Sequence, residues 1–334
     1  MDLQKRIRLA SYTTFNIGGV ARYFVDIRTK AELKRAVSFA KKSNLPIFVI
    51  GEGSDILISD KDFDGLVIRF VNKNVEIEDS FVTSGSGVKW DDLVRVVVGK
   101  NLQGIECLSG IPGTVGAAPV QNIGAYGQEL KDIFEKALIF DVQKEKFLYF
   151  NKKDCNFSYR ESVFKKEKGR YIIFEVILKL KKNGEIIITY ESLKNYLLEN
   201  KIVKIDLENV RNAVLKIRSE KLEDPKRIPN AGSFFKNPIV SLRDFQRIKN
   251  SSPDIKGIES SSGVKLFAGW LIEKAGWKGR RFGAVGVSSQ NALVLINFND
   301  GTADQMKELA EKIIDDVNRK FGIELEPEVQ FVNF

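Results

Sequence analysis

The segment 109–130, "SGIPGTVGAAPVQNIGAYGQEL", constrains the possible folds of this chain more than any other stretch. It contains five glycines in 22 residues, together with many other small side chains. Glycine allows backbone N–H groups to approach a ligand closely, and successive N–H groups form a concave site for an anion. Because the segment is too long for an ordinary turn, we predict a folded loop that binds a phosphate-bearing ligand.

A second glycine-containing turn, "GEGSDIL" at 51–57, follows an apolar run that predicts a strand. The two turns together suit the pyrophosphate of a dinucleotide. Neither is a Rossmann fingerprint, because the third glycine of that pattern would fall at Ile56, and the sequence has no G-x-x-x-x-G-K-[ST] motif. Taken alone, this turn is equally compatible with an ordinary tight turn. In the longer segment, Gln121 and Asn122 add amide donors and acceptors that suit a flat heterocycle.

The order of the expected elements predicts an α+β fold. A capping box formed by Thr29 and Glu32 opens an expected helix at 29–44, and apolar residues at helical spacing predict helices at 89–101, 209–222 and 303–322. Strands are expected at 21–27, 46–54, 65–70, 74–79, 81–87, 170–182, 185–190 and 323–332. The elements alternate without a strict βαβ repeat, which favours the α+β class. The 334 residues are enough for two or three domains.

The chain contains no histidine and only two cysteines, Cys107 and Cys155. A catalytic serine usually takes a histidine as its base, so a serine hydrolase is disfavoured. The same lack argues against a structural zinc site, and two cysteines leave little for a disulfide framework. We therefore expect no metal, and chemistry that depends on carboxylates, lysine, arginine, serine, tyrosine or a cofactor.

The net charge of +9 favours anionic partners. Basic runs at 165–170 and 178–184 look like solvated strand ends, and the sequence has no RNA-binding aromatic motif or recognition helix. A nucleotide-sized ligand is therefore favoured over nucleic acid. The N-terminus lacks the apolar stretch of a signal peptide, and no apolar run reaches the roughly 18 residues of a membrane-spanning helix. We expect a cytoplasmic protein that does not enter a membrane.

Ser233 lies in the segment 230–238, "NAGSFFKNP", between a glycine and two phenylalanines. This setting suggests a nucleophile or an acid, but the histidine base that a nucleophilic serine usually needs is absent. The structural alternative is a helix N-cap ahead of the phenylalanines. Pro238 argues against a long helix here, which weakens that alternative.

Six segments occur in the order found in the UDP-N-acetylenolpyruvoylglucosamine reductases, the flavoenzymes of bacterial peptidoglycan synthesis. They are "TTFNIGGVARYFV" (13–25), "GEGSDILIS" (51–59), "IPGTVGAAPVQNIGAYGQEL" (111–130), "YRES" (159–162), "NAGSFFKNP" (230–238) and "LEPEV" (325–329). Each motif alone is modest, but the ordered set spans nearly the whole chain and is specific. The chain therefore resembles this family. Its second glycine segment and Tyr190 resemble those of the longer subtype, which carries a tyrosine loop that covers the substrate.

The resemblance implies an FAD-binding module of two α+β subdomains, of the vanillyl-alcohol-oxidase type, and a C-terminal α+β substrate domain. The expected boundaries are 1–70, 71–220 and 221–334, with a final strand near 324–334 able to return to the FAD module. Non-covalent FAD is expected, since the histidine that tethers flavin in some members of the wider superfamily is absent. NADPH is the expected co-substrate, and a monomer is the expected state.

The cofactor-binding residues implied by the resemblance belong to the two glycine-containing turns. They are Gly51, Glu52, Gly53, Ser54, Asp55, Ser109, Gly110, Ile111, Pro112, Gly113, Gly116, Ala117, Gln121, Asn122, Gly124, Ala125, Tyr126 and Gly127.

The family reaction implies that hydride passes from NADPH to the flavin, and from flavin N5 to carbon 3 of the enolpyruvyl group of UDP-N-acetylglucosamine enolpyruvate. The product is UDP-N-acetylmuramate. Ser233 takes the role of the acid that protonates carbon 2, and Arg160 and Glu328 lie against the substrate carboxylate. Glu328 would be repelled there unless it is protonated or paired with Arg160. Without the resemblance, a surface ion pair between Arg160 and Glu161 and a strand-edge carboxylate at Glu328 are the simpler interpretations.

Substrate contacts are implied for Tyr159, Tyr190, Lys221, Asn237 and Asn291. Helical spacing places Lys221 on the inward side of its helix, although a lysine at a helix end often only answers the helix dipole. Tyr190 is expected to cover the diphosphate, with an ordinary aromatic at a strand end as the alternative.

Other basic residues have weaker assignments. Arg280 and Arg281 are candidates for phosphate contacts or for a solvated turn. Lys236 or Lys221 is a candidate for easing the return of a proton to Ser233.

Three positions depart from the family pattern. Gln330 stands where arginine is usual, Asn291 lies near a usual glutamine or histidine, and Glu223 occupies a place where proline is common. The change at Gln330 weakens any local charge partner for Glu328. These departures concern the placement of the substrate, not the reaction.

Two other functions compete with the reductase. One is a different flavoenzyme of the same fold that oxidises an alcohol or amine, which would not need Arg160, Ser233 and Glu328 together. The other is a non-catalytic nucleotide-binding module, which would explain the charge and the glycines but gives Ser233 no task.

Overall fold

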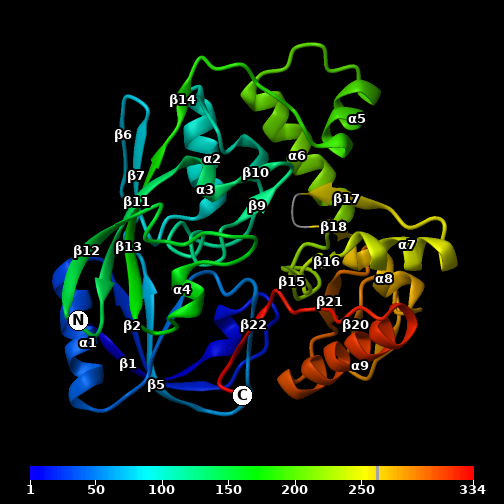
Figure 1. Ribbon diagram of the computed structural model, residues 1–334. Coiled ribbons are helices and arrows are strands. Elements are labelled where there is room, and N and C mark those ends of the chain that lie inside the picture. The colour runs from blue at the N-terminus through cyan, green and yellow to red at the C-terminus, as the bar shows by residue number, and fades with distance from the viewer. Residues whose placement is uncertain (261–262) are drawn as a thin grey trace. The chain divides into compact units, whose positions relative to one another are not determined.

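The computed structural model describes residues 1–260 and 263–334 (Figure 1), and these residues divide into two units. The first unit comprises Met1–Ile7, Ala21–Gly53 and Phe63–Glu220. The second comprises Arg8–Val20, Ser54–Asp62 and Lys221–Phe334, so it takes two short pieces from the N-terminal part of the chain. The division into domains at 1–70, 71–220 and 221–334 stays a prediction.

One sheet of the first unit has four strands in the order β1-β2-β5-β3. They are β1 (Leu3–Arg8), β2 (Val20–Ile27), β5 (Phe63–Phe70) and β3 (Ile47–Ile50), and β5 pairs in parallel with both β2 and β3. Helix α1 (Lys30–Lys42) begins with the predicted capping box of Thr29 and Glu32. Its apolar stripe at helical spacing (Leu33, Ala36, Val37 and Ala40) packs in one cluster with Val25, Ile27, Leu66 and Ile68 of the sheet.

The other large sheet of the first unit is antiparallel, with the order β12-β11-β13-β7-β6. Its strands are β6 (Val75–Glu78), β7 (Phe81–Gly85), β11 (Phe134–Asp141), β12 (Lys146–Asn151) and β13 (Tyr171–Lys179). Helix α2 (Trp90–Gly99) packs Trp90, Leu93, Val94 and Val97 into the same apolar cluster as Ala137 and Val176 of this sheet. Because α2 starts shortly after β7, it brings the chain back to the sheet next to the glycine-rich segment.

Short elements connect and cover these sheets. They are β8 (Leu102–Gln103), η2 (Glu106–Leu108), β9 (Gly124–Ala125), β10 (Gln128–Glu129), α3 (Leu130–Ile133), α4 (Val163–Lys166), β14 (Lys181–Lys182), α5 (Glu191–Glu199) and α6 (Leu207–Lys221). Helices α5 and α6 share a small apolar cluster that contains Leu193, Leu197, Val210 and Val214.

The strand expected at 185–190 is wrong. This stretch pairs with no strand within the described residues. The Glu185 carbonyl oxygen accepts from Gln103 Nε2 at 2.7 Å, and the Tyr190 carbonyl oxygen accepts from the Leu193 and Lys194 amides of α5. Ile186 and Ile188 pack against apolar clusters, whereas Ile187 is 70% exposed. The alternation that predicted a strand is therefore real, but pairing ends at β14 and the extended chain has no neighbour to bond with.

The second unit contains two small sheets and a two-stranded ladder. Their orders are β15-β21-β20-β19, β16-β18-β17 and β22-β4. The strands are β4 (Ile56–Ile58), β15 (Asn230–Ser233), β16 (Ile239–Val240), β17 (Gly257–Ser260), β18 (Gly263–Leu266), β19 (Arg281–Phe282), β20 (Val285–Val287), β21 (Val294–Asn297) and β22 (Gln330–Val332). Its helices are η1 (Leu9–Tyr12), α7 (Leu242–Ser251), α8 (Ala268–Lys274) and α9 (Ala303–Phe321).

Helix α9 provides much of the core of the second unit, and Figure 1 shows it running beside β20. Its buried stripe (Met306, Leu309, Ala310, Ile313 and Val317) joins one cluster with residues of β20 and β21. A capping box of Thr302 and Gln305 starts the helix, and Gly322 ends it in the left-handed conformation, with φ 68°. The expected helix at 303–322 is thereby confirmed within one residue.

The C-terminal strand is shorter than expected. Only Gln330–Val332 forms a strand, in parallel with β4, while Phe235 and Pro327 form an isolated bridge ahead of it. Pro327 has no N–H to donate, which interrupts a continuous ladder. The mixture of helices and mainly antiparallel sheets confirms the α+β class. Within the described residues, no helix combines the length and the apolar character needed to cross a bilayer.

A pair of glycine substitutions tests how the helix ends are built. Gly322→Ala should lower the free energy of unfolding by about 1 kcal/mol, because the alanine must adopt the left-handed conformation. Gly99→Ala, at the end of α2, should raise it by about 0.5–1 kcal/mol, because no atom lies within 4 Å of the added Cβ and φ is not positive. Thermal unfolding with the same bound FAD should therefore move in opposite directions, and a shift of the same sign in both variants would contradict these assignments.

Candidate functional site

The two predicted glycine turns come together in the first unit. A Cβ atom added at Gly51 would lie 2.9 Å from Thr114 Oγ1 and 3.6 Å from the Cβ atom of Ala117. The Gly113 amide donates to Glu52 Oε2 at 3.0 Å. Residues 51–53 and 113–117 therefore line one cradle, as their glycine content predicted.

The longer turn is held by backbone pairing to the stretch before α2. The amide of Val115 donates to the Val88 carbonyl oxygen at 2.8 Å, and that of Gly116 donates to the Ser86 carbonyl oxygen at 3.1 Å. A Cβ atom at Gly116 would lie 2.5 Å from both Cβ and Oγ of Ser86. Only glycine fits here, so the close backbone approach is built into the sequence.

The two amide side chains of this segment differ in their surroundings. Asn122 is fully buried, with its Nδ2 donating to Glu129 Oε2 at 3.0 Å and to the Ser158 carbonyl oxygen at 3.1 Å. Gln121 Oε1 is buried and accepts no hydrogen bond from the described residues. Asn122 thus folds the segment, and Gln121 offers an acceptor that the protein does not use. The close glycine approach and this acceptor fit a flat, phosphate-bearing cofactor such as FAD.

The first part of the longer segment is tied to α2 and α6. The Gly110 amide donates to Asp91 Oδ1 at 2.6 Å, and Arg211 makes two bonds to the same carboxylate, at 2.6 and 2.8 Å. Arg218 Nε donates to the Gly110 carbonyl oxygen at 3.2 Å. Burial by itself would raise the pKa of Asp91, but the bonds from Arg211 and Gly110 outweigh it and hold that pKa below its usual value. Ser109, which is also buried, donates to the Glu106 carbonyl oxygen at 2.6 Å.

The remaining predicted cofactor residues lie on both sides of these anchors. Ile111 and Pro112 follow Gly110, Gly124 and Ala125 form β9, and Tyr126 and Gly127 turn the chain toward β10. The shorter turn is divided between the units, with Gly51, Glu52 and Gly53 in the first and Ser54 and Asp55 in the second.

Arg160 adopts a strained backbone conformation next to this segment. Its φ is 56°, which is uncommon for a residue with a Cβ atom and is characteristic of functional sites. Its Nη2 donates to the Gly124 carbonyl oxygen at 2.8 Å, and its guanidinium lies 5.3 Å from the centre of the Tyr159 ring. The structure therefore brings Arg160 and Tyr159 together with the predicted cofactor loop.

Two tyrosines meet at the next turn of the same loop. Tyr126 also has a positive φ, of 47°, and its ring packs edge-on against Tyr190 with centres 5.4 Å apart. Burial raises the pKa of the Tyr126 hydroxyl. Tyr190 immediately precedes α5, so the alternative of an aromatic at a strand end is wrong.

The basic run 165–170 is not simply a solvated strand end. Lys165 lies on α4, its side chain is only 11% exposed, and its ammonium donates to the Arg160 carbonyl oxygen at 3.3 Å. No periodic pattern marks this lysine in the sequence, because α4 is a single turn. The helix places a largely buried cation beside Arg160.

Ser233 is at the end of a strand, not at the start of a helix. It pairs with Val294 of β21, and the next amide, that of Phe234, donates to the Leu293 carbonyl oxygen at 2.8 Å. The N-cap alternative is therefore wrong. Asn291 lies three residues before β21, in a turn where its Oδ1 accepts from the Leu293 amide at 3.0 Å. Ser233 thus pairs with the first residue of β21, and Asn291 lies in the turn that leads into that strand.

The segment that contains Glu328 runs antiparallel to the segment that contains Ser233. The Glu328 amide donates to the Phe234 carbonyl oxygen at 2.8 Å, and the Lys236 amide donates to the Glu326 carbonyl oxygen at 2.9 Å. The Lys236 ammonium also pairs with Glu326 Oε1 at 2.5 Å, although the lysine side chain is only 9% exposed. This register places Glu328 opposite the residue that follows Ser233.

Two further predicted substrate residues are in the second unit. Asn237 Oδ1 accepts from the Ala268 amide at 2.9 Å, at the start of α8. Lys221 is the last residue of α6 and is exposed, so the expected inward orientation is wrong: the helix ends before this position can be covered. Glu223, where the family usually has proline, accepts a hydrogen bond from the Ser288 hydroxyl and leaves its Oε2 buried and without a partner among the described residues.

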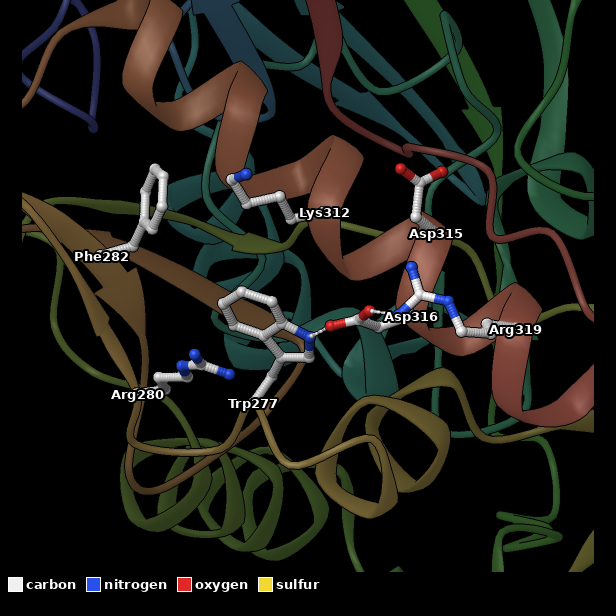
Figure 2. Close-up of a pocket in the computed structure, with 7 residues that line it drawn as sticks. All are labelled: Trp277, Arg280, Phe282, Lys312, Asp315, Asp316 and Arg319. Carbon is white, nitrogen blue, oxygen red and sulfur yellow. Dashed lines mark hydrogen bonds and ion pairs between the residues drawn. The ribbon is translucent and has the colours of Figure 1, made fainter.

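A separate pocket of about 380 Å³ lies between α9 and the loop that contains Arg280 (Figure 2). The Arg280 guanidinium is 4.6 Å from the Trp277 ring centre, and Trp277 Nε1 donates to Asp316 Oδ2 at 3.1 Å. Arg319 bonds to the same carboxylate at 2.8 Å. The walls of this pocket contain both signs of charge. Arg281 instead donates to the Gly283 carbonyl oxygen at 2.8 Å.

Comparison with known proteins identifies the family. A family model described as an FAD binding domain matches residues 21–143, and one described as the C-terminal domain of UDP-N-acetylenolpyruvoylglucosamine reductase matches residues 224–332. The protein of that name from Pseudomonas aeruginosa is 42% identical over 334 residues, which cover 98% of each chain. The chain belongs to the UDP-N-acetylenolpyruvoylglucosamine reductase family.

Other members of the reductase family agree over their full lengths. The reductase from Flavobacterium johnsoniae is 41% identical over 99% of this chain and 100% of its own. The crystal structure of the reductase from Thermus caldophilus matches with a TM-score of 0.72 and 25% identity over 99% of both chains. Membership confirms the resemblance expected from the six motifs and the expectation of FAD as cofactor.

The described residues contain no group of three or more His, Cys, Asp or Glu arranged to hold a metal ion. Cys107 and Cys155 are buried free thiols, and burial raises the pKa of each to about 12. Their thiolate forms are therefore scarce near neutral pH.

Asp91→Asn tests the anchor of the glycine segment. Because the folded-state pKa of Asp91 is lowered, its stabilisation is present above the unfolded-state value near 4 and is lost as the pH falls through the folded-state value. The variant should lose about 2 kcal/mol of unfolding free energy at pH 7, from its charge-assisted bonds. Between pH 5 and pH 3, the unfolding free energy measured with urea should also fall less for the variant than for the wild type. The matched control is Asp92→Asn, which removes a neighbouring carboxylate that makes an exposed pair with Arg95 and should leave the pH dependence close to that of the wild type. An equal pH dependence of Asp91→Asn and wild type would contradict the assignment.

Proposed function

We propose that the chain is an FAD-dependent reductase that uses NADPH to convert UDP-N-acetylglucosamine enolpyruvate to UDP-N-acetylmuramate. The observation that carries this proposal is the 42% identity, over 98% of each chain, to a protein named UDP-N-acetylenolpyruvoylglucosamine reductase. The grouping of Ser233, Asn291 and Glu328 on adjoining backbone segments supports it. A cytoplasmic monomer is the form that we expect to act on such a nucleotide sugar.

Bound FAD would supply hydride transfer from NADPH to carbon 3 of the enolpyruvyl group. The cradle that would hold FAD is formed by the turns around Gly51 and Gly116, where the lack of side chains lets the backbone segments approach closely. The acceptor at Gln121 would take a hydrogen bond from the cofactor. The other cofactor-binding residues implied by the resemblance complete this cradle.

Arg160 is proposed to bind the substrate carboxylate. Its planar guanidinium stays charged and matches a carboxylate with two parallel bonds. As the carboxylate takes up negative charge from the developing enolate, a preorganised cation stabilises it more than it stabilises the substrate. The bond to the Gly124 carbonyl oxygen and the left-handed backbone at Arg160 hold the guanidinium in place without a conformational search. Glu328 is proposed to act on the same carboxylate.

Ser233 is proposed to donate the proton to carbon 2. The enolate carbon is a stronger base than a serine alkoxide, so proton transfer from the Ser233 hydroxyl to that carbon runs downhill. The hydroxyl can therefore act as the acid without a histidine. The pairing with β21 and the ion pair of Lys236 with Glu326 fix the segment around the hydroxyl. Because Lys236 is already engaged, exposed Lys221 is the better candidate for easing the return of a proton from water.

The proposed substrate contacts are Tyr159, Tyr190, Lys221, Asn237 and Asn291. The Tyr190 ring is supported by Tyr126 at 5.4 Å, which suits a side chain that covers a bound diphosphate. Asn237 and Asn291 each use Oδ1 within the protein, which leaves the Nδ2 group of each to donate to a phosphate or carboxylate oxygen.

Purified protein mixed with NADPH and the enolpyruvyl sugar nucleotide tests the proposal directly. NADPH consumption should depend on the sugar nucleotide, and acid precipitation should release the yellow flavin because no histidine tethers it. Consumption coupled only to oxygen would identify a different flavoenzyme. If the protein binds no flavin, the proposed reductase function is wrong.

Ser233→Ala should separate the two half-reactions. NADPH should reduce the bound flavin at the wild-type rate, whereas reoxidation by the sugar nucleotide should slow by about 10³-fold, the usual contribution of a general acid. Stopped-flow absorbance of the flavin measures both steps. Ser251→Ala, a matched loss of an exposed hydroxyl on α7, should change neither. Equal losses in both steps would mean that Ser233 is structural.

A further inference from the structure

Lys89 occupies a position where a lysine is locally unfavourable. It is the N-cap residue of α2, and its side chain makes no capping bond. Serine, threonine, aspartate or asparagine is preferred there, and a cation opposes the positive end of the helix dipole. A residue that breaks a local rule marks a position under another constraint.

That constraint is visible in the cradle of the two glycine turns. Lys89 Nζ pairs with Glu52 Oε1 at 2.8 Å, and the other oxygen of this carboxylate accepts the Gly113 amide at 3.0 Å. The backbone of Lys89 bridges to Thr114, whose hydroxyl lies 2.9 Å from the place of a Cβ atom on Gly51. The lysine therefore lies beside both turns and is paired there, although its side chain is partly exposed.

Glu52 poses an electrostatic problem for a phosphate ligand. Its carboxylate is bonded directly to one of the glycine amides that line the cradle, so a diphosphate placed against these turns meets a negative charge at short range. The hydrogen bond that Lys89 donates to Glu52 raises the pKa of the Lys89 ammonium. The two side chains are partly exposed, at 58% for Lys89 and 29% for Glu52, so this interaction responds to salt.

We propose that Lys89 is a further residue of the cofactor site, where its ammonium offsets the Glu52 carboxylate and makes the cradle able to accept the diphosphate of FAD. This rests on the proposed placement of FAD against the two glycine turns. Lys89 is a positioning residue for the cofactor with no part in hydride or proton transfer. Glu52 in turn holds the Gly113 amide and so the shape of the longer turn.

A double-mutant cycle on FAD affinity tests this inference. Apoprotein of the wild type, Lys89→Met, Glu52→Gln and the double variant is titrated with FAD, and the quenching of flavin fluorescence gives each Kd at low and at high salt. Lys89→Met should weaken FAD binding about tenfold at low salt, and less at high salt. In the Glu52→Gln background the same change should have a clearly smaller effect, because the charge that Lys89 offsets is gone. Lys89→Arg should retain affinity.

Lys100→Met is the matched control, because it removes an exposed lysine at the opposite end of α2. It should leave the Kd for FAD unchanged, which rules out an effect of net charge alone. An equal loss from Lys89→Met in both backgrounds, or no loss in either, would overturn the proposal.

The proposed reaction and the proposed role of Lys89 can be contradicted independently of each other. If the cycle shows coupling but FAD-saturated wild type consumes no NADPH with the sugar nucleotide, the function is wrong and the role of Lys89 stands. If turnover is observed but the cycle shows no coupling, only the role of Lys89 is wrong.

Discussion

The backbone pairing of residues 113–116 with residues 86–90 is the contact on which the cofactor half of this molecule depends. It holds a loop of small residues against a sheet at a separation that excludes any side chain at Gly116. From that fixed point the chain continues through Asn122, which binds the segment to Ser158, and through Gly124, whose carbonyl oxygen receives Arg160. The pairing therefore sets the position of the glycine segment, and through Gly124 the position of the Arg160 guanidinium, which we propose binds the substrate.

In the second unit, short backbone pairing and an ion pair hold the segment that contains Ser233. Ser233 follows a glycine with φ 74° and is held by β21 on one side, while the Glu328 segment pairs just beyond it. The pairing is short and is interrupted by Pro327, so backbone bonds alone hold it weakly. The ion pair of Lys236 with Glu326 adds a charged side-chain bond at the same register. Removing Glu326 would leave a largely buried ammonium without this partner, which is costlier than the bond itself.

Features determined by local interactions were predictable from the sequence. The capping box at Thr29 and the stop at Gly322 depend on neighbours within four residues, and both helix ends fall within a few residues of the expected places. The meeting of the two glycine turns was predictable because both are rich in glycine and together suit the pyrophosphate of one dinucleotide. The stretch 185–190 failed because its alternating pattern specifies an extended backbone but not a partner strand.

The residues that were missed are cations whose environment is set by distant parts of the chain. Lys165 and Lys89 look like ordinary surface lysines in the sequence, and the first even lies in a run of charges. Lys165 is largely covered because α4 turns it toward Arg160, and Lys89 faces Glu52 because residues 113–116 pair beside it. The resemblance to the family suggests roles for Ser233, Arg160 and Glu328, but it does not point to Lys165 or Lys89, which lie outside the six motifs.

The way the second unit is assembled has a consequence for protein synthesis. Its core includes Phe15, Ile17 and Leu57, which are at most 2% exposed, yet most of their partners lie beyond residue 230. Strand β4 pairs with β22, so the residues around Leu57 cannot pair until the last few residues of the chain have been synthesised. During translation these apolar side chains stay exposed for almost the whole time that the ribosome needs to complete the protein. Chaperone binding to the nascent chain should therefore concentrate on residues 8–20 and 54–62, and a polypeptide cut after the first unit would leave both stretches as permanent aggregation-prone surfaces.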